Sequence, residues 1–291
     1  MKIVDALEYG VGKLYNKERP RLESELLLSY VLNVERIYLH LHFDQEVQAK
    51  DFESFASLIK RAERDEPLEY LVGKVGFYGY EWEICRGVLI PRPETEILVQ
   101  KADELIKFKK ISKVFELGVG SGVISITLAL LNPHLQILAS DINPKALELT
   151  QRNLQNFSAF DKTLPHRLCL LHENVLENET VFQKQSFELL ISNPPYISNS
   201  YKLPANVAYE PKEALFGGEG GEEILCALVK LGEKYRIPFL ACEMGSDQRE
   251  KMQTQLKHFE EIEFYQDFAG LDRGFICKIL RYNPLRFVLN T

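Results

Sequence analysis

The residues with the clearest chemical meaning are Asn193-Pro194-Pro195-Tyr196. They follow an apolar run, Phe187–Ile191, that predicts a buried strand ending at the carboxyl edge of a parallel sheet. Neither proline carries an N–H, so the turn is rich in acceptors: the Asn193 side-chain oxygen and the backbone carbonyls. Such a pocket suits a planar –NH2 group, and Tyr196 adds a flat face beside it. These four are the candidate catalytic and substrate-binding residues. The alternative is an ordinary turn after a strand, because Asn and Pro are common turn residues.

A glycine-rich loop, Gly118-Val119-Gly120-Ser121-Gly122, lies upstream between a predicted strand and a predicted helix. Its glycines allow a tight turn and a close approach of a ligand to the backbone. The spacing is GxGxG followed by Val123, which departs from the dinucleotide fingerprint GxGxxG, and no phosphate-binding GxxxxGK[ST] loop is present. The loop therefore favours a nucleoside-like ligand without a pyrophosphate.

Two carboxylates, one before this loop and one at the end of the next predicted strand, indicate what the ligand is. Asp141 ends the next predicted strand, about 20 residues further on, where an acidic side chain can accept hydrogen bonds from ribose hydroxyls. Glu116 precedes the loop and could face an ammonium group, directly or through water. A ligand with an amino-acid end, a ribose and no phosphates fits S-adenosylmethionine. The alternative is a loop that serves packing alone, with Asp141 beside the helix cap Asn143-Pro144.

Composition limits the classes of protein. The chain has 291 residues, of which 45% are hydrophobic and 26% charged, as in a soluble enzyme of one large or two modest domains. A net charge of −7 argues against binding nucleic acid mainly through counterion release. Five widely spaced cysteines without a CxxC pair suggest reduced thiols in a cytoplasmic protein, and six scattered histidines suggest no metal site. No membrane span or signal peptide is predicted.

The chain changes pattern along its length. Helical spacing of apolar residues predicts three helices before residue 72, which would form a small bundle. Residues 77–84 are aromatic and partly alternating, which predicts a β-hairpin connecting that bundle to the rest. From Val114 onward strands and helices alternate, which predicts an α/β fold with a doubly wound, mostly parallel sheet. Two strand-like runs, 261–266 and 275–280, could pair antiparallel at its edge.

These motifs in this order resemble the class I S-adenosylmethionine-dependent methyltransferases of the NPPY type. Four further segments are similar to the peptide chain release factor glutamine methyltransferases: Leu89–Glu96, Tyr209–Gly218, Glu243–Gln248 and Asp267–Arg273. The likeness covers essentially the whole chain. It implies a Rossmann-like, seven-stranded sheet and N5-methylation of the glutamine in the Gly-Gly-Gln motif of class 1 release factors. The alternatives are a ribosomal-protein glutamine methyltransferase or a nucleic-acid amino-methyltransferase.

The resemblance also implies an organisation and a set of roles. Residues 1–72 would recognise the substrate, residues 73–90 would be a hairpin linker, and residues 91–291 would be the methyltransferase domain. A monomer acting on a protein, with no nucleic-acid or membrane partner, is expected. The family usually shows an acidic residue followed by a large one near the adenine, whereas this chain has Asn174-Val175, so altered adenine packing is expected. The implied cofactor-binding residues are Glu116, Gly118, Val119, Gly120, Ser121, Gly122, Asp141, Asn174, Val175 and Asn193.

Overall fold

The structure of this chain is a computed structural model, which describes residues 1–279. Its contacts divide the chain into two compact units. The first comprises Met1–Lys74 with the short segments Ile84–Arg86 and Leu203–Tyr209, and the second comprises the rest. Among residues 1–279, no helix combines the length and the apolar character needed to cross a membrane. The division of the chain at residues 72 and 90 stays a prediction.

The first unit is helical, as the spacing of its apolar residues predicts. Leu7, Leu27, Phe55 and Ile59 are buried in a common core. A Cβ on Gly10 would come within 2.7 Å of the Ser24 hydroxyl oxygen, so the absence of a side chain there lets the first two helices pack closely. The predicted helices are α1 (Ile3–Lys13), α2 (Pro20–Leu32) and α4 (Ala49–Ala62); the short helices α3 (Arg36–Leu41) and α5 (Leu68–Val72) are additional.

The predicted hairpin is formed by β1 (Lys74–Phe77) and β2 (Tyr80–Glu83). Its two turn residues, Tyr78 and Gly79, have φ angles of 52° and 76°, which is the backbone of a tight hairpin turn. Trp82 is fully buried, and its ring lies 4.2 Å from that of Phe157 on α8 (Pro144–Phe157). From Val75 onward the hairpin therefore packs within the second unit.

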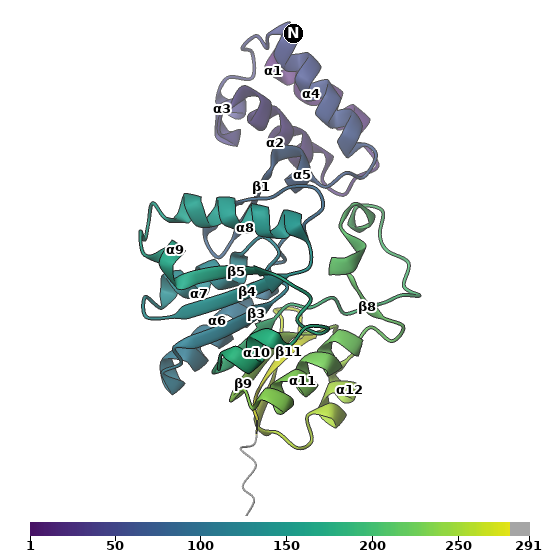
Figure 1. The fold of residues 1–291 in the computed structure, drawn as a ribbon. Coiled ribbons are helices and arrows are strands. Elements are labelled where there is room, and N and C mark those ends of the chain that lie inside the picture. The colour runs from purple at the N-terminus through teal and green to yellow at the C-terminus, as the bar shows by residue number, and fades with distance from the viewer. Residues whose placement is uncertain (280–291) are drawn as a thin grey trace, which may run out of the picture. The chain divides into compact units, whose positions relative to one another are not determined.

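The second unit is built on a seven-stranded sheet with the order β10-β11-β9-β6-β3-β4-β5 (Figure 1). The five strands from β9 to β5 are parallel, and β11 and β10 continue the sheet antiparallel. This confirms the predicted fold and the antiparallel pair at the edge, although Leu280 of that prediction lies outside the described residues. The strands are β3 (Lys113–Leu117), β4 (Gln136–Asp141), β5 (Leu168–His172), β6 (Leu189–Ser192), β9 (Phe239–Glu243), β10 (Glu260–Gln266) and β11 (Asp272–Lys278).

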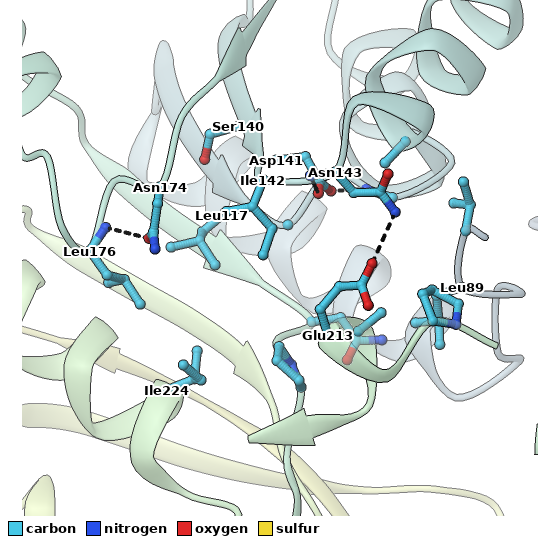
Figure 2. A pocket seen from close by; sticks show the side chains of 18 of the residues that line it. Leu89, Leu117, Ser140, Asp141, Ile142, Asn143, Asn174, Leu176, Glu213 and Ile224 are labelled. Atoms are coloured by element: carbon cyan, nitrogen blue, oxygen red, sulfur yellow. Dashed lines mark hydrogen bonds between the residues drawn. The ribbon is translucent and has the colours of Figure 1, made fainter. Parts of the chain in front are cut away.

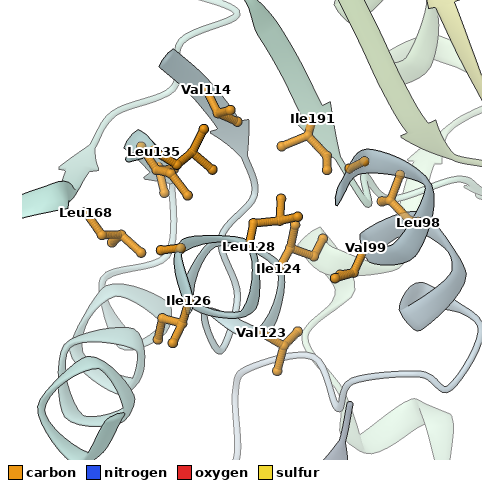
Figure 3. Packing of buried hydrophobic residues seen from close by; sticks show 14 of the residues in the cluster. Leu98, Val99, Val114, Val123, Ile124, Ile126, Leu128, Leu135, Leu168 and Ile191 are labelled. Atoms are coloured by element: carbon orange, nitrogen blue, oxygen red, sulfur yellow. The ribbon is translucent and has the colours of Figure 1, made fainter. Parts of the chain in front are cut away.

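Helices cover both faces of the sheet because successive strand residues point to opposite sides. On one face, Val114 and Ile191 share a core with Ile124 and Leu128 of α7 (Val123–Leu131) and with Leu98 of α6 (Thr95–Lys109) (Figure 3). On the other face, Phe115, Leu190 and Leu240 form a second core. The first face carries α6 (Thr95–Lys109), α7 (Val123–Leu131), α8 and α9 (Leu164–Arg167), and the second carries α10 (Thr180–Lys184), α11 (Glu223–Tyr235) and α12 (Arg249–Gln255).

Candidate active site

Three neighbouring strands end at the same level and bring the predicted motifs together. In the sheet register, Leu117 at the end of β3 lies opposite Ser140 of β4 and Ser192 of β6. The chain order reverses here, because β4 and β5 extend the sheet to one side of β3 while β6 lies on the other. This is the switch point where open α/β sheets bind ligands.

A cavity of about 320 Å³ opens at this edge of the sheet. Figure 2 shows Asn143, Glu213 and Leu89 on one side of it and Asn174 and Leu176 on the other. Seven predicted site residues line it: Gly118, Gly120, Asp141, Asn174, Val175, Asn193 and Pro195. Six others do not: Glu116, Val119, Ser121, Gly122, Pro194 and Tyr196.

Some residues of the glycine loop line the cavity, and others pack against the rest of the unit. Gly118 and Gly120 have φ angles of 78° and 57°, and a Cβ at either position would project into open space. A Cβ on Gly122, in contrast, would come within 2.8 Å of the Thr150 methyl carbon. Val119 belongs to the hydrophobic core. Alternate residues of the loop therefore face the cavity, and the others anchor it.

Asp141 holds this loop in shape as well as facing the cavity. Its Oδ2 accepts a hydrogen bond from the Gly120 N–H at 2.9 Å, and its Oδ1 accepts one from the Asn143 N–H at 2.9 Å. Burial raises the pKa of the carboxyl group, and these backbone hydrogen bonds oppose that rise. Each oxygen keeps a further lone pair, so Asp141 can still accept from the hydroxyls of a ribose.

Glu116 lies behind the loop and not on the wall of the cavity. It is fully buried, its Oε2 accepts a hydrogen bond from the Ser125 hydroxyl, and its Oε1 has no hydrogen-bond partner among the described residues. Burial raises its pKa to about 8. Glu116 follows Phe115 on β3, and successive strand residues point to opposite faces of the sheet, so the Glu116 side chain points toward Ser125 on α7. A contact between Glu116 and an ammonium group stays a prediction.

Asn174 and Val175, where the chain departs from the family pattern, both line the cavity. The Asn174 Oδ1 accepts from the Leu176 N–H at 3.3 Å, which leaves its –NH2 group as a donor toward a ligand. Val175 is 1% exposed and belongs to the core on that face of the sheet. This end of the cavity offers a polar amide beside apolar walls, which suits a purine ring.

Asn193 presents its amide in one orientation. Its Nδ2 donates to the Thr95 hydroxyl at 3.0 Å, and no hydrogen bond from the described residues reaches its Oδ1. None reaches the backbone carbonyl of Pro194 either. No described residue therefore donates to either oxygen, although the Pro194 ring itself is buried. That these two oxygens hold a substrate amide stays a prediction.

Two segments that the sequence marked only by resemblance close the cavity. Leu89 lines it from one segment, and Pro211, Glu213 and Phe216 line it from the other. Glu210 ties the two together, because it accepts from the Ile90 N–H at 3.0 Å and pairs with Arg92. Neither apolar periodicity nor turn chemistry indicates a partnership across such a distance in sequence.

The donor set of the cavity fits the ligand expected from the sequence. It has a carboxylate for a ribose, two open glycines for close backbone approach and an amide with apolar walls for a base. Among residues 1–279, no group of three or more His, Cys, Asp or Glu side chains is arranged to hold a metal ion. The described residues thus support a nucleoside-sized organic ligand beside Asn193.

Comparison with known proteins gives two family descriptions and a set of relatives that match this chain. The description "PrmC N-terminal domain" matches residues 5–73, and "Methyltransferase small domain" matches residues 93–216. The release factor glutamine methyltransferase of Clostridium acetobutylicum is 34% identical over 94% of this chain and 97% of its own length. That of Dictyoglomus turgidum is 37% identical over 90% and 92% of the two chains.

A solved structure shows the same fold. The catalytic domain of hMettl16, in complex with the MAT2A 3′UTR hairpin 6, superimposes with a TM-score of 0.54 and 11% identity, covering 80% of this chain and 83% of that one. At that identity the likeness shows the fold alone. The extent and identity of the sequence matches show more: this chain belongs to the family of release factor glutamine methyltransferases.

Proposed function

We propose that this protein transfers a methyl group from S-adenosylmethionine to the side-chain amide nitrogen, N5, of the glutamine in the Gly-Gly-Gln motif of class 1 release factors. The observation that carries the proposal is the pair of free acceptors at the turn, the Asn193 Oδ1 and the Pro194 carbonyl. A primary carboxamide has two N–H donors in one plane, so two fixed acceptors can hold both. The names of the relatives support the release factor as substrate.

The cavity residues are assigned to the methyl donor on the same grounds. Asp141 would accept from the ribose hydroxyls, Gly118 and Gly120 would lie against the ligand, and Asn174 with Val175 would contact the adenine. When bound, S-adenosylmethionine supplies an electrophilic methyl carbon on a positively charged sulfur. Asn193 lines the cavity and is also the first residue of the turn proposed to hold the substrate. This supports a place for Asn193 between the methyl donor and the substrate amide.

The chain's own residues would contribute mainly by orientation. An amide nitrogen is a poor nucleophile because its lone pair is delocalised into the carbonyl. Fixing both of its N–H bonds aims the nitrogen and removes the freedom that it would otherwise have to lose, which can lower the barrier by several kcal/mol, on the order of 7. The product formed first would be a positively charged, N-protonated N-methyl amide, which is strongly acidic and can release one proton to a nearby acceptor or to water, leaving the neutral methylated amide. None of the described residues that line the cavity is a histidine or a lysine, so a dedicated base is not part of the proposal.

We also propose that the helical unit recognises the release factor, that the enzyme acts as a monomer, and that it works in the cytoplasm, where release factors act. Three exposed apolar side chains in or next to α3 support the recognition role: Ile37, Leu41 and Phe43 are 60%, 69% and 57% exposed. A protein partner would cover such surface.

Mass spectrometry of a purified class 1 release factor tests the function. After incubation with this protein and S-adenosylmethionine, the peptide that contains Gly-Gly-Gln should gain the mass of one methyl group, and fragmentation should place it on the glutamine. Incubation without the enzyme is the control. A methyl group on a ribosomal protein, with the release factor unmodified, would instead support the alternative substrate.

A further inference from the structure

A chain of hydrogen bonds lies behind Asn193 and ends on a buried carboxylate. The Asn193 Nδ2 donates to the Thr95 Oγ1 at 3.0 Å, and the Thr95 hydroxyl donates to the Glu243 Oε2 at 2.7 Å. The other oxygen of Glu243 accepts from the Tyr196 hydroxyl at 3.1 Å. A single carboxylate thus holds both the first and the last residue of the substrate turn.

The sheet explains how these residues meet. Strand β9 runs parallel to β6, and Ser192 lies opposite Cys242, so Glu243 is the next position along from that pair, as Asn193 is. Thr95 is the first residue of α6, which packs over the same edge. Thr95 and Glu243 are 148 residues apart in sequence. The parallel register of β6 and β9 and the packing of α6 place the three groups together.

The chemistry of the three groups fixes which of them donates in each of these hydrogen bonds. An ionised carboxylate can only accept, so the Thr95 hydroxyl must use its one proton toward Glu243. Thr95 can then only accept from Asn193, and only the amide –NH2 can donate to it. The amide oxygen of Asn193 must therefore face the other way, where the described residues offer it no donor. The two ends of an amide have nearly the same shape, so packing alone would not choose between them.

Glu243 is an unusual group to bury for structural reasons alone. It is 1% exposed and Thr95 is 2% exposed, and Glu243 takes part in no ion pair among the described residues. A buried carboxylate without a cation is costly, and hydrogen bonds from neutral hydroxyls offset only part of that cost. The cost of burying the Glu243 charge is explained if that charge has a function in the site.

We propose that Glu243, acting through Thr95, is a positioning residue that fixes the Asn193 amide with its oxygen toward the substrate, and that its bond to Tyr196 fixes that ring in the same turn. The catalytic part of this inference rests on the proposed function, whereas the orientation of the amide does not. If Glu243 were protonated, it could donate to Thr95. The Thr95 hydroxyl could then donate to the Asn193 oxygen, and the Asn193 side-chain amide could flip so that its oxygen and nitrogen exchange places.

The orientation of the Asn193 amide should therefore depend on pH, because it depends on the ionisation of Glu243. Burial raises its pKa to about 7, against the hydrogen bonds from Thr95 and Tyr196, which lower it. The charged neighbours are Glu94 before α6, which raises the pKa, and Arg273 on β11, which lowers it. Tyr265 on β10 is also near enough to Glu243 for the two groups to interact electrostatically, and its hydroxyl lies 3.4 Å from the Cys242 carbonyl oxygen. The orientation should hold above this pKa and loosen below it.

The kinetic test uses isosteric variants of the full-length protein. Thr95→Val and Glu243→Gln should each lower kcat for release factor methylation by roughly 10- to 100-fold, the range expected for a misplaced reacting group. The KM for S-adenosylmethionine should stay within about twofold. Thr95→Ser, which keeps the hydroxyl, should restore most of kcat. Thr127→Val is the matched control, because the Thr127 hydroxyl is buried in α7 without a hydrogen-bond partner among the described residues, and it should behave as wild type.

A pH profile and an NMR measurement separate positioning from mere stability. In the wild type kcat should rise from about pH 6 to about pH 8 as Glu243 ionises, and this rise should be absent in Glu243→Gln. The side-chain amide protons of Asn193 should exchange faster with water in Thr95→Val and Glu243→Gln than in the wild type or Thr127→Val. Wild-type kcat in both variants, or unchanged amide exchange in both, overturns the proposal. If the wild-type protein does not methylate a release factor, the proposed function falls, and the amide exchange still decides the orientation of Asn193.

Discussion

At the scale of single residues, the site contains two kinds of oxygen atom: those that accept no hydrogen bond from the described residues, and those that already accept one from the backbone. The Asn193 Oδ1 and the Pro194 carbonyl accept nothing from the described residues, whereas both oxygens of Asp141 hold backbone N–H groups. In the proposed function, the first kind would hold the substrate amide. The second kind holds the glycine loop and would also face the methyl donor. Substitutions at the two kinds of residue should therefore have different kinetic effects.

Asn193→Ala should nearly abolish methyl transfer while leaving cofactor binding largely intact. It removes one of two acceptors for the amide, and losses of roughly 100- to 1,000-fold in kcat are typical when a hydrogen-bonding group acts mainly in the transition state. Kinetics with a Gly-Gly-Gln peptide and calorimetry with S-adenosylmethionine measure the two effects. Asn206→Ala, at an exposed asparagine, is the control. Turnover near the wild-type rate would contradict the role of Asn193.

The buried carboxyl group of Glu116 should make stability depend on pH. Its pKa is raised from 4.5 to about 8 by burial, so between these values the folded chain keeps a proton that the unfolded chain has lost. Stability should therefore fall as the pH rises through that window. Relative to Glu116→Gln, the wild type should lose on the order of 3 kcal/mol between about pH 5 and about pH 8.5 in urea unfolding. A parallel pH dependence of the two proteins would contradict this, and Glu104→Gln is an exposed control.

At the scale of elements, the glycine loop shows what the sequence can and cannot predict. Its place between β3 and α7, and the strand that ends at Asp141, follow from apolar runs and turn residues. The sequence alone does not indicate which loop residues face the ligand. Val119 and Gly122 turn toward the packing side because the register of β3 and the position of α8 decide it, and both are tertiary features.

This difference within the loop can be measured with two matched variants. Gly120→Ala and Gly122→Ala both place a side chain at a positive φ, but only the methyl group at position 122 would collide with Thr150. Gly122→Ala should therefore melt roughly 5 °C lower than Gly120→Ala, because overpacking costs about 1–3 kcal/mol. Gly120→Ala should weaken cofactor binding, since its Cβ would enter the cavity. Thermal unfolding and calorimetry measure both, and equal melting temperatures would contradict the assignment.

The residues that the sequence left without a role share one property: they act through partners far away in the chain. Thr95 reads as the start of a helix and Glu243 as the end of a strand, and their meeting with Asn193 depends on the order of the strands. Short helices such as α3 and α5 also escape prediction, since fewer than two turns carry little periodicity. What local pattern encodes could be predicted, and what register and strand order encode could not.

At the scale of the whole molecule, the helical unit is more than the first 72 residues. It also contains Leu203–Tyr209, which follows the substrate turn in the sequence. The Tyr209 hydroxyl donates to the Arg64 carbonyl at 2.8 Å, and the Arg86 guanidinium lies 5.5 Å from the centre of the Tyr209 ring. Deletion of residues 1–72 would remove the bond to Arg64 and leave a segment that follows the active-site turn without its support. Truncation is therefore a poor test of a docking role.

Surface substitutions test docking without that damage. Ile37 and Leu41 lie one helical turn apart on α3, and exposed Phe43 follows them. Replacing all three by serine should raise KM for an intact release factor by roughly 10-fold, because apolar anchors carry much of the energy of an interface. Methylation of a short Gly-Gly-Gln peptide should be unchanged, since it would not reach that surface. Phe108→Ser, at a side chain 79% exposed on α6, is the control. Equal losses on factor and peptide would contradict docking by this unit.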